Sequence, residues 1–291
     1  MPDARAGRPT LQAIVLTAAA MLAFAANSLL CRLALLQGDI DPASFASIRL
    51  VSGAITLGVI VRCRSRPLSP RHSDWLATAM LFAYVAFFSF AYLTLAAGTG
   101  ALILFGAVQL TMFSVGLRSG EMFGFIAWLG LTLAVAGLVY LVSPGVAAPP
   151  LLGAVLMAIA GVAWGVYSLR GRGVADPLAA TAANFARAAP LALVLSLIYA
   201  ANAHANAAGV GLAIASGALT SGIGYVIWYA ALSRLAAMQA ATVQLSVPLI
   251  AAFGGVIFLS EPITPRLAAA SAAILGGIAL VLTSRSRKAP P

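Results

Sequence analysis

Long runs without any charged residue are the feature that most constrains this sequence. Even the shortest of the five longest runs exceeds the roughly 20 apolar residues that one bilayer-spanning helix needs. The runs therefore predict a chain that crosses a membrane many times. They cover residues 9–31, 75–117, 122–169, 188–233 and 235–260.

The composition excludes a soluble globular domain. Apolar residues make up 62% of the chain and charged residues 8%, whereas soluble domains average about 45–50% and about 25%. The runs also lack the alternation over about 10 residues that marks transmembrane β-barrel strands. The sequence therefore predicts an all-α polytopic membrane protein.

The longest runs contain turn-forming segments that divide each of them in two, at Ala96–Gly100, Ser143–Pro150 and Asn202–Gly209. Ten transmembrane helices result, and little chain remains for a soluble domain. Their expected limits are residues 11–35, 44–61, 75–96, 100–117, 122–142, 151–169, 178–200, 209–232, 239–259 and 266–284.

The basic residues lie between the spans and indicate an orientation. A net charge of +10 would suit a nucleic-acid partner in a soluble protein, but here most of the 17 Lys and Arg fall on one side of the membrane. The positive-inside rule then places both tails, residues 1–10 and 285–291, in the cytoplasm. We expect no nucleic-acid partner. The residues expected inside are Arg5, Arg8, Arg62, Arg64, Arg66, Arg71, Arg118, Arg170, Arg172, Arg234, Arg285, Arg287 and Lys288.

An alternative for the first span is a cleaved signal peptide, because Ala23-Phe24-Ala25 follows a basic start and an apolar stretch. The apolar run continues to Cys31, and removal would leave nine helices, so we expect the span to be retained. Cys31 and Cys63 lie in different environments and form neither a disulfide framework nor a metal site. No cofactor is expected.

The two halves of the chain resemble each other. The matches keep the same order along the chain and predict a duplication, with five-helix repeats at residues 11–142 and 151–284. Because five is odd, the second repeat enters the membrane inverted. Many secondary transporters are built this way, with a binding site near the midplane between the halves. The matching segments are Phe24–Arg32 with Trp164–Arg172, Asp41-Pro42 with Asp176-Pro177, Val108-Gln109-Leu110 with Val243-Gln244-Leu245, and Glu121 with Glu261.

Each repeat has a Glu before its last span, in Gly120-Glu121 and in Ser260-Glu261-Pro262, and a last span that contains glycine. With ten spans, this pattern resembles the drug/metabolite transporter superfamily, specifically its EamA-type members, over nearly the whole chain. The length and the aromatic-rich third and eighth spans make it similar to the YddG-type bacterial amino-acid exporters. The resemblance implies an inner-membrane exporter of amino acids or related metabolites. One departure is Phe24-Ala25, where first spans of the family often carry Trp-Gly.

Polar and aromatic residues near mid-span are the candidates for a substrate cavity, since polar side chains are costly in lipid and face the protein interior. Rings with a hydroxyl or N–H group suit a cavity for ligands of mixed polarity. The alternatives are packing, interhelical hydrogen bonds or, for Tyr92, Tyr167 and Tyr229, an interfacial belt. The predicted substrate-binding residues are Asn27, Tyr84, Phe88, Tyr92, Gln109, Trp164, Asn184, Tyr225, Trp228 and Gln244.

Three arginines lie within or beside spans. Arg32 and Arg49 are expected toward the outer face, where long side chains can snorkel and pair with Asp39 or Asp41. Arg187, deeper in the seventh span, is an alternative partner for a substrate carboxylate.

All seven acidic residues are expected in tails or at helix ends, which disfavours a carboxylate-based proton relay and strong selection for cations. Glu121 and Glu261 are expected to stabilise the N-termini of the fifth and tenth spans through the helix dipole. Gly98, Gly100 and Pro248 are candidate hinges, with close helix packing as the alternative for the glycines. Further candidate hinges are Gly222, Gly224, Gly254 and Gly255.

These observations favour a secondary exporter of amino acids or related small metabolites that works by alternating access. Export of drugs or sugars would differ only in the chemistry of the cavity, and a scaffold without transport stays open. An intramembrane enzyme needs positioned acids, bases or metal ligands. Against an enzyme, His72 and His204 are expected on opposite sides, and no motif pairs a Ser or Cys with a base.

Overall fold

The computed structural model describes residues 11–64, 74–172, 174–235, 237–283 and 287–288. In these residues, nine helical stretches are long and apolar enough to cross a membrane, and the helix Trp75–Ala91 is a shorter apolar one. The predicted all-α polytopic membrane protein with about ten spans is thus confirmed. The expectations for Arg5, Arg8, Arg66, Arg71, His72 and Arg285 lie outside the described residues.

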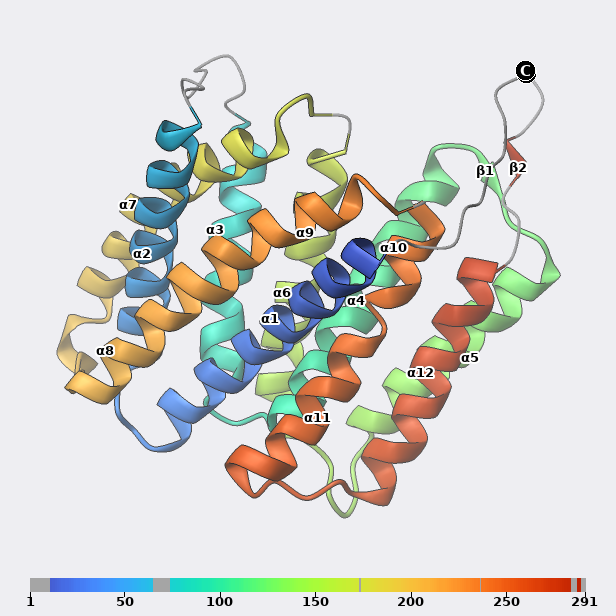
Figure 1. Ribbon diagram of the computed structural model, residues 1–291. Helices are drawn as coiled ribbons and strands as arrows, with labels where there is room; N and C mark the ends of the chain where they lie inside the picture. The colour runs from blue at the N-terminus through green and yellow to red at the C-terminus, as the bar shows by residue number, and fades with distance from the viewer. Residues whose placement is uncertain (1–10, 65–73, 173, 236, 284–286, 289–291) are drawn as a thin grey trace.

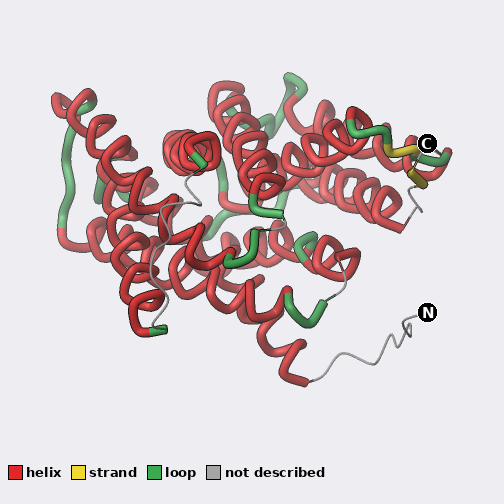
Figure 2. The backbone as a smooth tube through the Cα atoms, turned by 90° about the horizontal axis from the view of Figure 1, so that it is seen from above, coloured by secondary structure: helices red, strands yellow, loops and turns green. Residues whose placement is uncertain are grey.

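The first five spans are single helices, whereas two of the last five are composite. The first half contains α1 (Leu11–Leu36), α2 (Pro42–Cys63), α3 (Trp75–Ala91), α4 (Ala97–Arg118) and α5 (Phe125–Val142). The second half contains the single helices α6 (Leu151–Arg170), α7 (Pro177–Ile198) and α12 (Pro265–Thr283). One composite span consists of α8 (Ala207–Ile214), the π-helix η3 (Ala215–Ile223) and α9 (Gly224–Leu232). The other consists of α10 (Ala237–Val243) and α11 (Ser246–Leu259). A short turn, η2 (Ala200–Asn202), precedes α8. The antiparallel strands β1 (Glu121–Met122) and β2 (Arg287–Lys288) lie at the edge of the bundle (Figure 2).

The links between helices gather at two ends of the bundle (Figure 1). One end, upper in Figure 1, holds the C-terminal ends of α2, α4, α6 and α9, and we call it the basic end. The α1–α2, α3–α4, α5–α6, α7–α8 and α11–α12 links lie at the opposite end. The assignment of the basic end to the cytoplasm stays a prediction. Its described basic residues include Arg62, Arg64, Arg118, Arg170, Arg172 and Arg234, together with Arg287 and Lys288 of β2.

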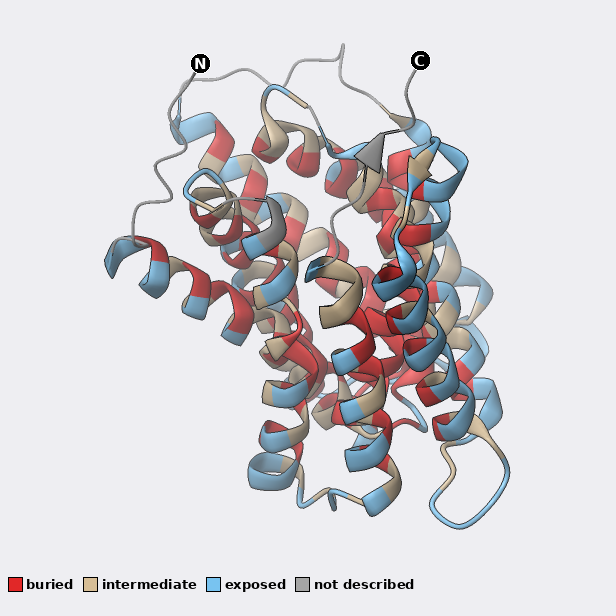
Figure 3. Ribbon diagram, turned by 90° about the vertical axis from the view of Figure 1, so that its right-hand side faces the viewer, coloured by how far each residue is buried: buried red, intermediate tan, exposed pale blue. Residues whose placement is uncertain are grey.

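The helices expose apolar side chains outward and bury mainly small or aromatic residues inside (Figure 3). Small residues let helices approach closely, as is common in membrane bundles. A Cβ atom added to Gly130 of α5 would lie 2.5 Å from the carbonyl oxygen of Gly277 of α12. A methyl group at either position would therefore push this helix pair apart.

Most helix packing joins the two halves of the chain. Helix α5 packs on α12, α2 on α7 and α4 on α11. The contact of α3 with α6 has its counterpart in that of α1 with α9, and the contact of α4 with α6 in that of α1 with α11. An inverted duplication predicts this pattern, because each contact between the halves recurs with corresponding spans of the two repeats interchanged. The limits of the two repeats stay a prediction.

Gly98 and Gly100, which were expected to break the run of residues 75–117, lie inside a helix. Helix α4 begins at Ala97, and α3 ends at Ala91 rather than at residue 96. A Cβ atom on Gly98 would lie 2.6 Å from that of Ala252, and one on Gly100 would lie 2.5 Å from the Tyr92 ring. These glycines permit close helix packing and do not break the chain. The predicted limits of the third span at residue 96 and of the fourth span at residue 100 were therefore wrong.

Glu121 and Glu261 were expected to stabilise the N-termini of the fifth and tenth spans, and the described part of the chain shows neither contact. The Glu261 carboxylate accepts a hydrogen bond from Nε of Arg32 at 3.0 Å and from the backbone N–H of Ala97 at 2.8 Å. It therefore stabilises the start of α4, and the start of α12 uses the Thr264 side chain instead. Glu121 lies in β1 rather than in the first turn of α5.

Candidate functional site

A small cavity lies between elements of the two halves. Its walls come from α1, α2, α3 and α4 of the first half, and from α6, η3, α9 and the α10–α11 junction of the second. Its volume is about 30 Å³, whereas ligand pockets typically have about 300–1,000 Å³. The halves are therefore closed around the cavity, and a metabolite can enter only if they separate. The lining residues are Phe24, Asn27, Ser28, Arg49, Tyr84, Phe88, Leu104, Phe105, Trp164, Thr220, Ser221, Tyr225 and Gln244.

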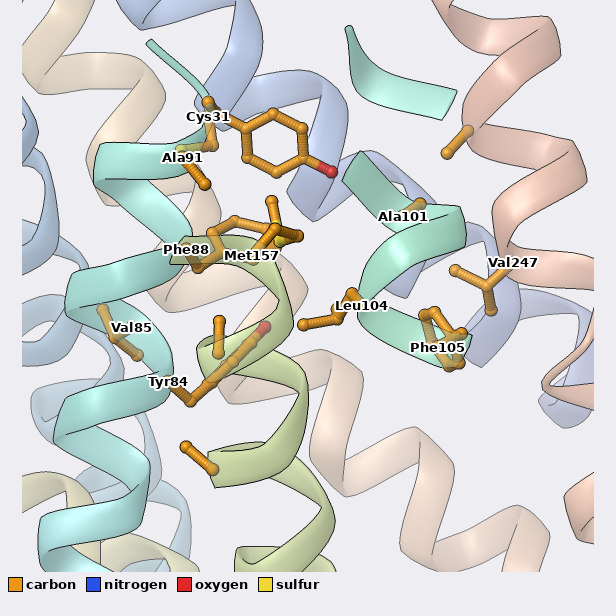
Figure 4. Packing of buried hydrophobic residues seen from close by; sticks show 14 of the residues in the cluster. Cys31, Tyr84, Val85, Phe88, Ala91, Ala101, Leu104, Phe105, Met157 and Val247 are labelled. Carbon is orange, nitrogen blue, oxygen red and sulfur yellow. The ribbon is translucent and has the colours of Figure 1, made fainter. Parts of the chain in front are cut away.

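Six of the predicted substrate-binding residues line this cavity together: Asn27, Tyr84, Phe88, Trp164, Tyr225 and Gln244. The ring of Trp164 is central, because its centroid lies 4.9 Å from that of Tyr84 and 5.6 Å from that of Tyr225. Tyr84 extends from α3 toward Leu104 of α4, and Phe88 lies one turn further along α3 (Figure 4). The cavity thus has an aromatic wall built from α3, α6 and α9.

Four predicted residues do not line the cavity: Tyr92, Gln109, Asn184 and Trp228. Tyr92 lies just beyond the end of α3, and its hydroxyl donates to a backbone carbonyl at 3.2 Å. The Asn184 side-chain oxygen accepts from Thr78 at 3.2 Å, and Trp228 packs edge-on against Phe24 at 5.8 Å. Gln109 is half-buried on α4. Local hydrogen bonds and packing account for three of the four.

Tyr167 and Tyr229 share one hydrogen-bonding partner rather than forming an interfacial belt. The Tyr167 hydroxyl donates to Thr181 at 3.4 Å, and the Tyr229 hydroxyl lies 2.7 Å from the same oxygen. This network joins α6, α7 and α9 inside the second half.

The helix η3 places a row of hydroxyl groups beside the cavity, which the sequence analysis missed. Ser216 and Thr220 both donate to the side-chain oxygen of Asn27, at 2.7 and 3.2 Å, and the amide nitrogen of Asn27 donates to Tyr84 at 3.4 Å. The wider turn of a π-helix brings Ser216, Thr220 and Ser221 to one side. Single π-turns within α-helices often occur at functional sites. A run of Ser, Thr and Gly within an apolar span is the signal that could have indicated them.

Arg49 is the largest departure from the predicted site, because it was expected near the outer face. It is 1% exposed and lines the cavity. Nη2 donates to the Tyr84 hydroxyl at 3.0 Å, and Nε donates to Ser221 at 3.2 Å. The guanidinium carbon lies 5.2 Å from the centroid of the Tyr84 ring and 5.0 Å from that of Phe88. The predicted snorkelling of Arg49 is therefore wrong.

The prediction that Asp39 or Asp41 pairs with Arg32 or Arg49 is wrong. Asp41 accepts hydrogen bonds from the backbone N–H groups of Ala43, Ser44 and His204, at 3.0, 2.9 and 3.1 Å. Burial opposes its ionisation, but a hydrogen bond from the Ser44 side chain and these backbone hydrogen bonds together outweigh that effect and hold the pKa of Asp41 below its usual value. Asp39 accepts from the side chain of Asn206 at 2.6 Å.

Arg187 does not line the cavity. Its guanidinium carbon lies 5.9 Å from the centroid of the Trp75 ring, at the start of α3. The side chain therefore reaches toward the basic end, and it is Arg49 that presents a guanidinium to the cavity.

About ten apolar helices around a central cavity define a multi-pass membrane protein, and comparison with known proteins gives its class. Residues 151–283 match the EamA-like transporter family. The uncharacterized protein PA1977 of Pseudomonas aeruginosa is 52% identical over 281 residues, covering 97% of this chain and 98% of its own. A protein of known crystal structure, 19% identical, has a TM-score of 0.66 and covers 92% of this chain and 96% of its own, so the two share a fold.

The protein is thus a membrane transporter of small molecules. The chain belongs to the EamA-like transporter family.

Proposed function

We propose that this transporter exports amino acids, aromatic ones among them, or related small metabolites across the bacterial inner membrane by alternating access. The observation that carries the proposal is the composition of the central cavity. Aromatic rings suit apolar side chains, and the amides of Asn27 and Gln244 suit polar groups of the same ligand. The rings belong to Phe24, Tyr84, Phe88, Phe105, Trp164 and Tyr225.

Contacts at both ends of the bundle join the two halves and would act as gates. At the end opposite the basic end, the ion pair of Arg32 with Glu261 joins α1 to the α11–α12 link at 3.0 Å. At the basic end, Asp74 pairs with Arg170 at 2.6 Å. Burial opposes ionisation of Asp74, but the hydrogen bond and charge of Arg170, together with backbone N–H donors at the start of α3, outweigh burial and hold the pKa of Asp74 below its usual value. Alternating access requires that the Arg32–Glu261 and Asp74–Arg170 contacts open one at a time. By the positive-inside rule, the basic end is expected to face the cytoplasm.

Efflux from loaded cells tests the proposal. Cells loaded with radiolabelled phenylalanine should lose it faster when they make the protein. Trp164→Ala should abolish the gain, because it removes the central ring of the cavity wall. Trp128→Ala should leave the gain in efflux unchanged, because Trp128 lies outside the cavity and is 47% exposed. Immunoblots of the membranes control for protein level.

Equal efflux with and without the protein would contradict amino-acid export. Inhibition of efflux by unlabelled drugs or sugars, and not by amino acids, would favour the alternative substrates instead.

A further inference from the structure

We infer that Arg49 binds the carboxylate of the substrate, so that the central cavity selects zwitterions and organic anions over amines. The inference rests on the proposed function, since it names the chemical group by which that cavity recognises its substrate.

Arg49 carries a positive charge in the interior of a membrane protein without a negative partner. Buried charges are normally paired, because an isolated one is costly. In the described part of the chain, Arg32 and Arg170 form ion pairs, and no ion pair includes Arg49. The described carboxylates lie at helix ends or in links: Asp39, Asp41, Asp74, Glu121, Asp176 and Glu261.

The guanidinium also has an unused donor. Nε and Nη2 bind neutral hydroxyl groups of Ser221 and Tyr84, whereas Nη1 is buried and has no hydrogen-bond partner. A carboxylate is the acceptor that matches two parallel N–H groups of arginine. The geometry therefore leaves a place for one anionic group beside Nη1.

The surroundings of Arg49 suit a ligand with an apolar part. The faces of Tyr84 and Phe88 stabilise the cation in part, and Trp164 extends the aromatic wall. The N-terminus of α11 follows Gln244, which also lines the cavity, and the helix dipole there favours negative charge. An amine without a carboxylate would meet the charge of Arg49 and find no anion among the described lining residues.

Three ligands with the same ring test the inference on purified full-length protein in detergent, with tryptophan fluorescence as the readout of binding. They are L-phenylalanine, 3-phenylpropionate, which lacks the ammonium group, and phenethylamine, which lacks the carboxylate. The first two should bind at least about 10-fold more tightly than phenethylamine, as expected for one charged hydrogen-bonded pair. Equal or tighter binding of phenethylamine would overturn the inference. This comparison uses the wild-type protein alone, so it holds even if a variant fails to fold.

Variants at two arginines supply a matched control. Arg49→Gln should weaken binding of 3-phenylpropionate roughly 10- to 100-fold, while Arg187→Gln, outside the cavity, should leave it unchanged. Unchanged binding in Arg49→Gln would overturn the inference.

The outcomes separate the carboxylate site from amino-acid export. If 3-phenylpropionate and phenylalanine bind through Arg49 but phenylalanine is not exported, the carboxylate site stands and amino-acid export fails. If wild type and Arg49→Gln export phenylalanine equally, export stands and the carboxylate site is overturned. Failure of both carboxylates to bind the wild-type protein would also overturn the site.

Discussion

At the scale of single residues, Asp41 caps the N-terminus of α2, the helix that carries Arg49 to the cavity. Its carboxylate accepts hydrogen bonds at the start of α2 and from the link that precedes α8. The same cap fixes the start of α2 at Pro42, which places Arg49 about two turns inside the helix. Capping one helix therefore helps to set the depth of the guanidinium in the cavity.

Replacement of Asp41 by asparagine should lower stability by about 1–2 kcal/mol at neutral pH, because the amide cannot reproduce all three accepted hydrogen bonds. The pKa of Asp41 is lowered in the folded protein. Its contribution is therefore fully present above the unfolded pKa of about 4, and is lost as the pH falls through the lowered value. The difference in melting temperature between wild type and Asp41→Asn should be largest at pH 7 and shrink below about pH 4. An equal difference at pH 7 and pH 3 would contradict this role.

At the scale of elements, the π-helix η3 decides how the eighth span meets α2. A Cβ atom added to Gly217 would collide with the Arg49 carbonyl oxygen and with the hydroxyl of Ser52. Glycine thus allows the backbones to approach, and Ser221 comes within hydrogen-bonding distance of Arg49. The geometry of the cavity depends on this contact.

Alanine at Gly217 should separate η3 from α2 and destabilise the protein by about 1–3 kcal/mol, the usual cost of overpacking. Gly211 of the same span is a matched control, since an added Cβ atom there meets nothing within 4 Å. Thermal unfolding in detergent should show a lower melting temperature for Gly217→Ala and not for Gly211→Ala. Equal melting temperatures for the two variants would refute the packing argument.

The elements that could be predicted are those set by local composition. Long charge-free runs predicted the spans, and helical spacing put Tyr84 and Phe88 on one face of α3, which lines the cavity. The ring of Tyr92 follows on the same face, with its centroid 4.7 Å from that of Phe88, but Tyr92 lies at the end of α3 and does not line the cavity. The π-turn of η3 and the break before α11 depend on packing between distant segments, which no local pattern records. Arg49 was misplaced for a related reason, since snorkelling is the rule only where no interior cavity is near.

At the scale of the whole molecule, the two halves meet around a cavity of about 30 Å³ and are joined by ion pairs at both ends. Transport requires that the cavity open to each side in turn. The break between α10 and α11 lies at Gln244, and interrupted helices are a common feature of substrate sites in transporters. Gln244 is therefore a suitable reporter of access to the cavity.

Cysteine labelling at this position tests the central claim most directly. The two native thiols, Cys31 and Cys63, are first replaced by alanine and serine. Gln244→Cys should then react with a membrane-impermeant thiol reagent added from either side, in intact cells and in inverted vesicles. Phe253→Cys in α11 of the same composite span, at a position 61% exposed on the apolar exterior, should react from neither side. Labelling of Gln244→Cys from neither side would contradict a central cavity that opens alternately to the two sides of the membrane.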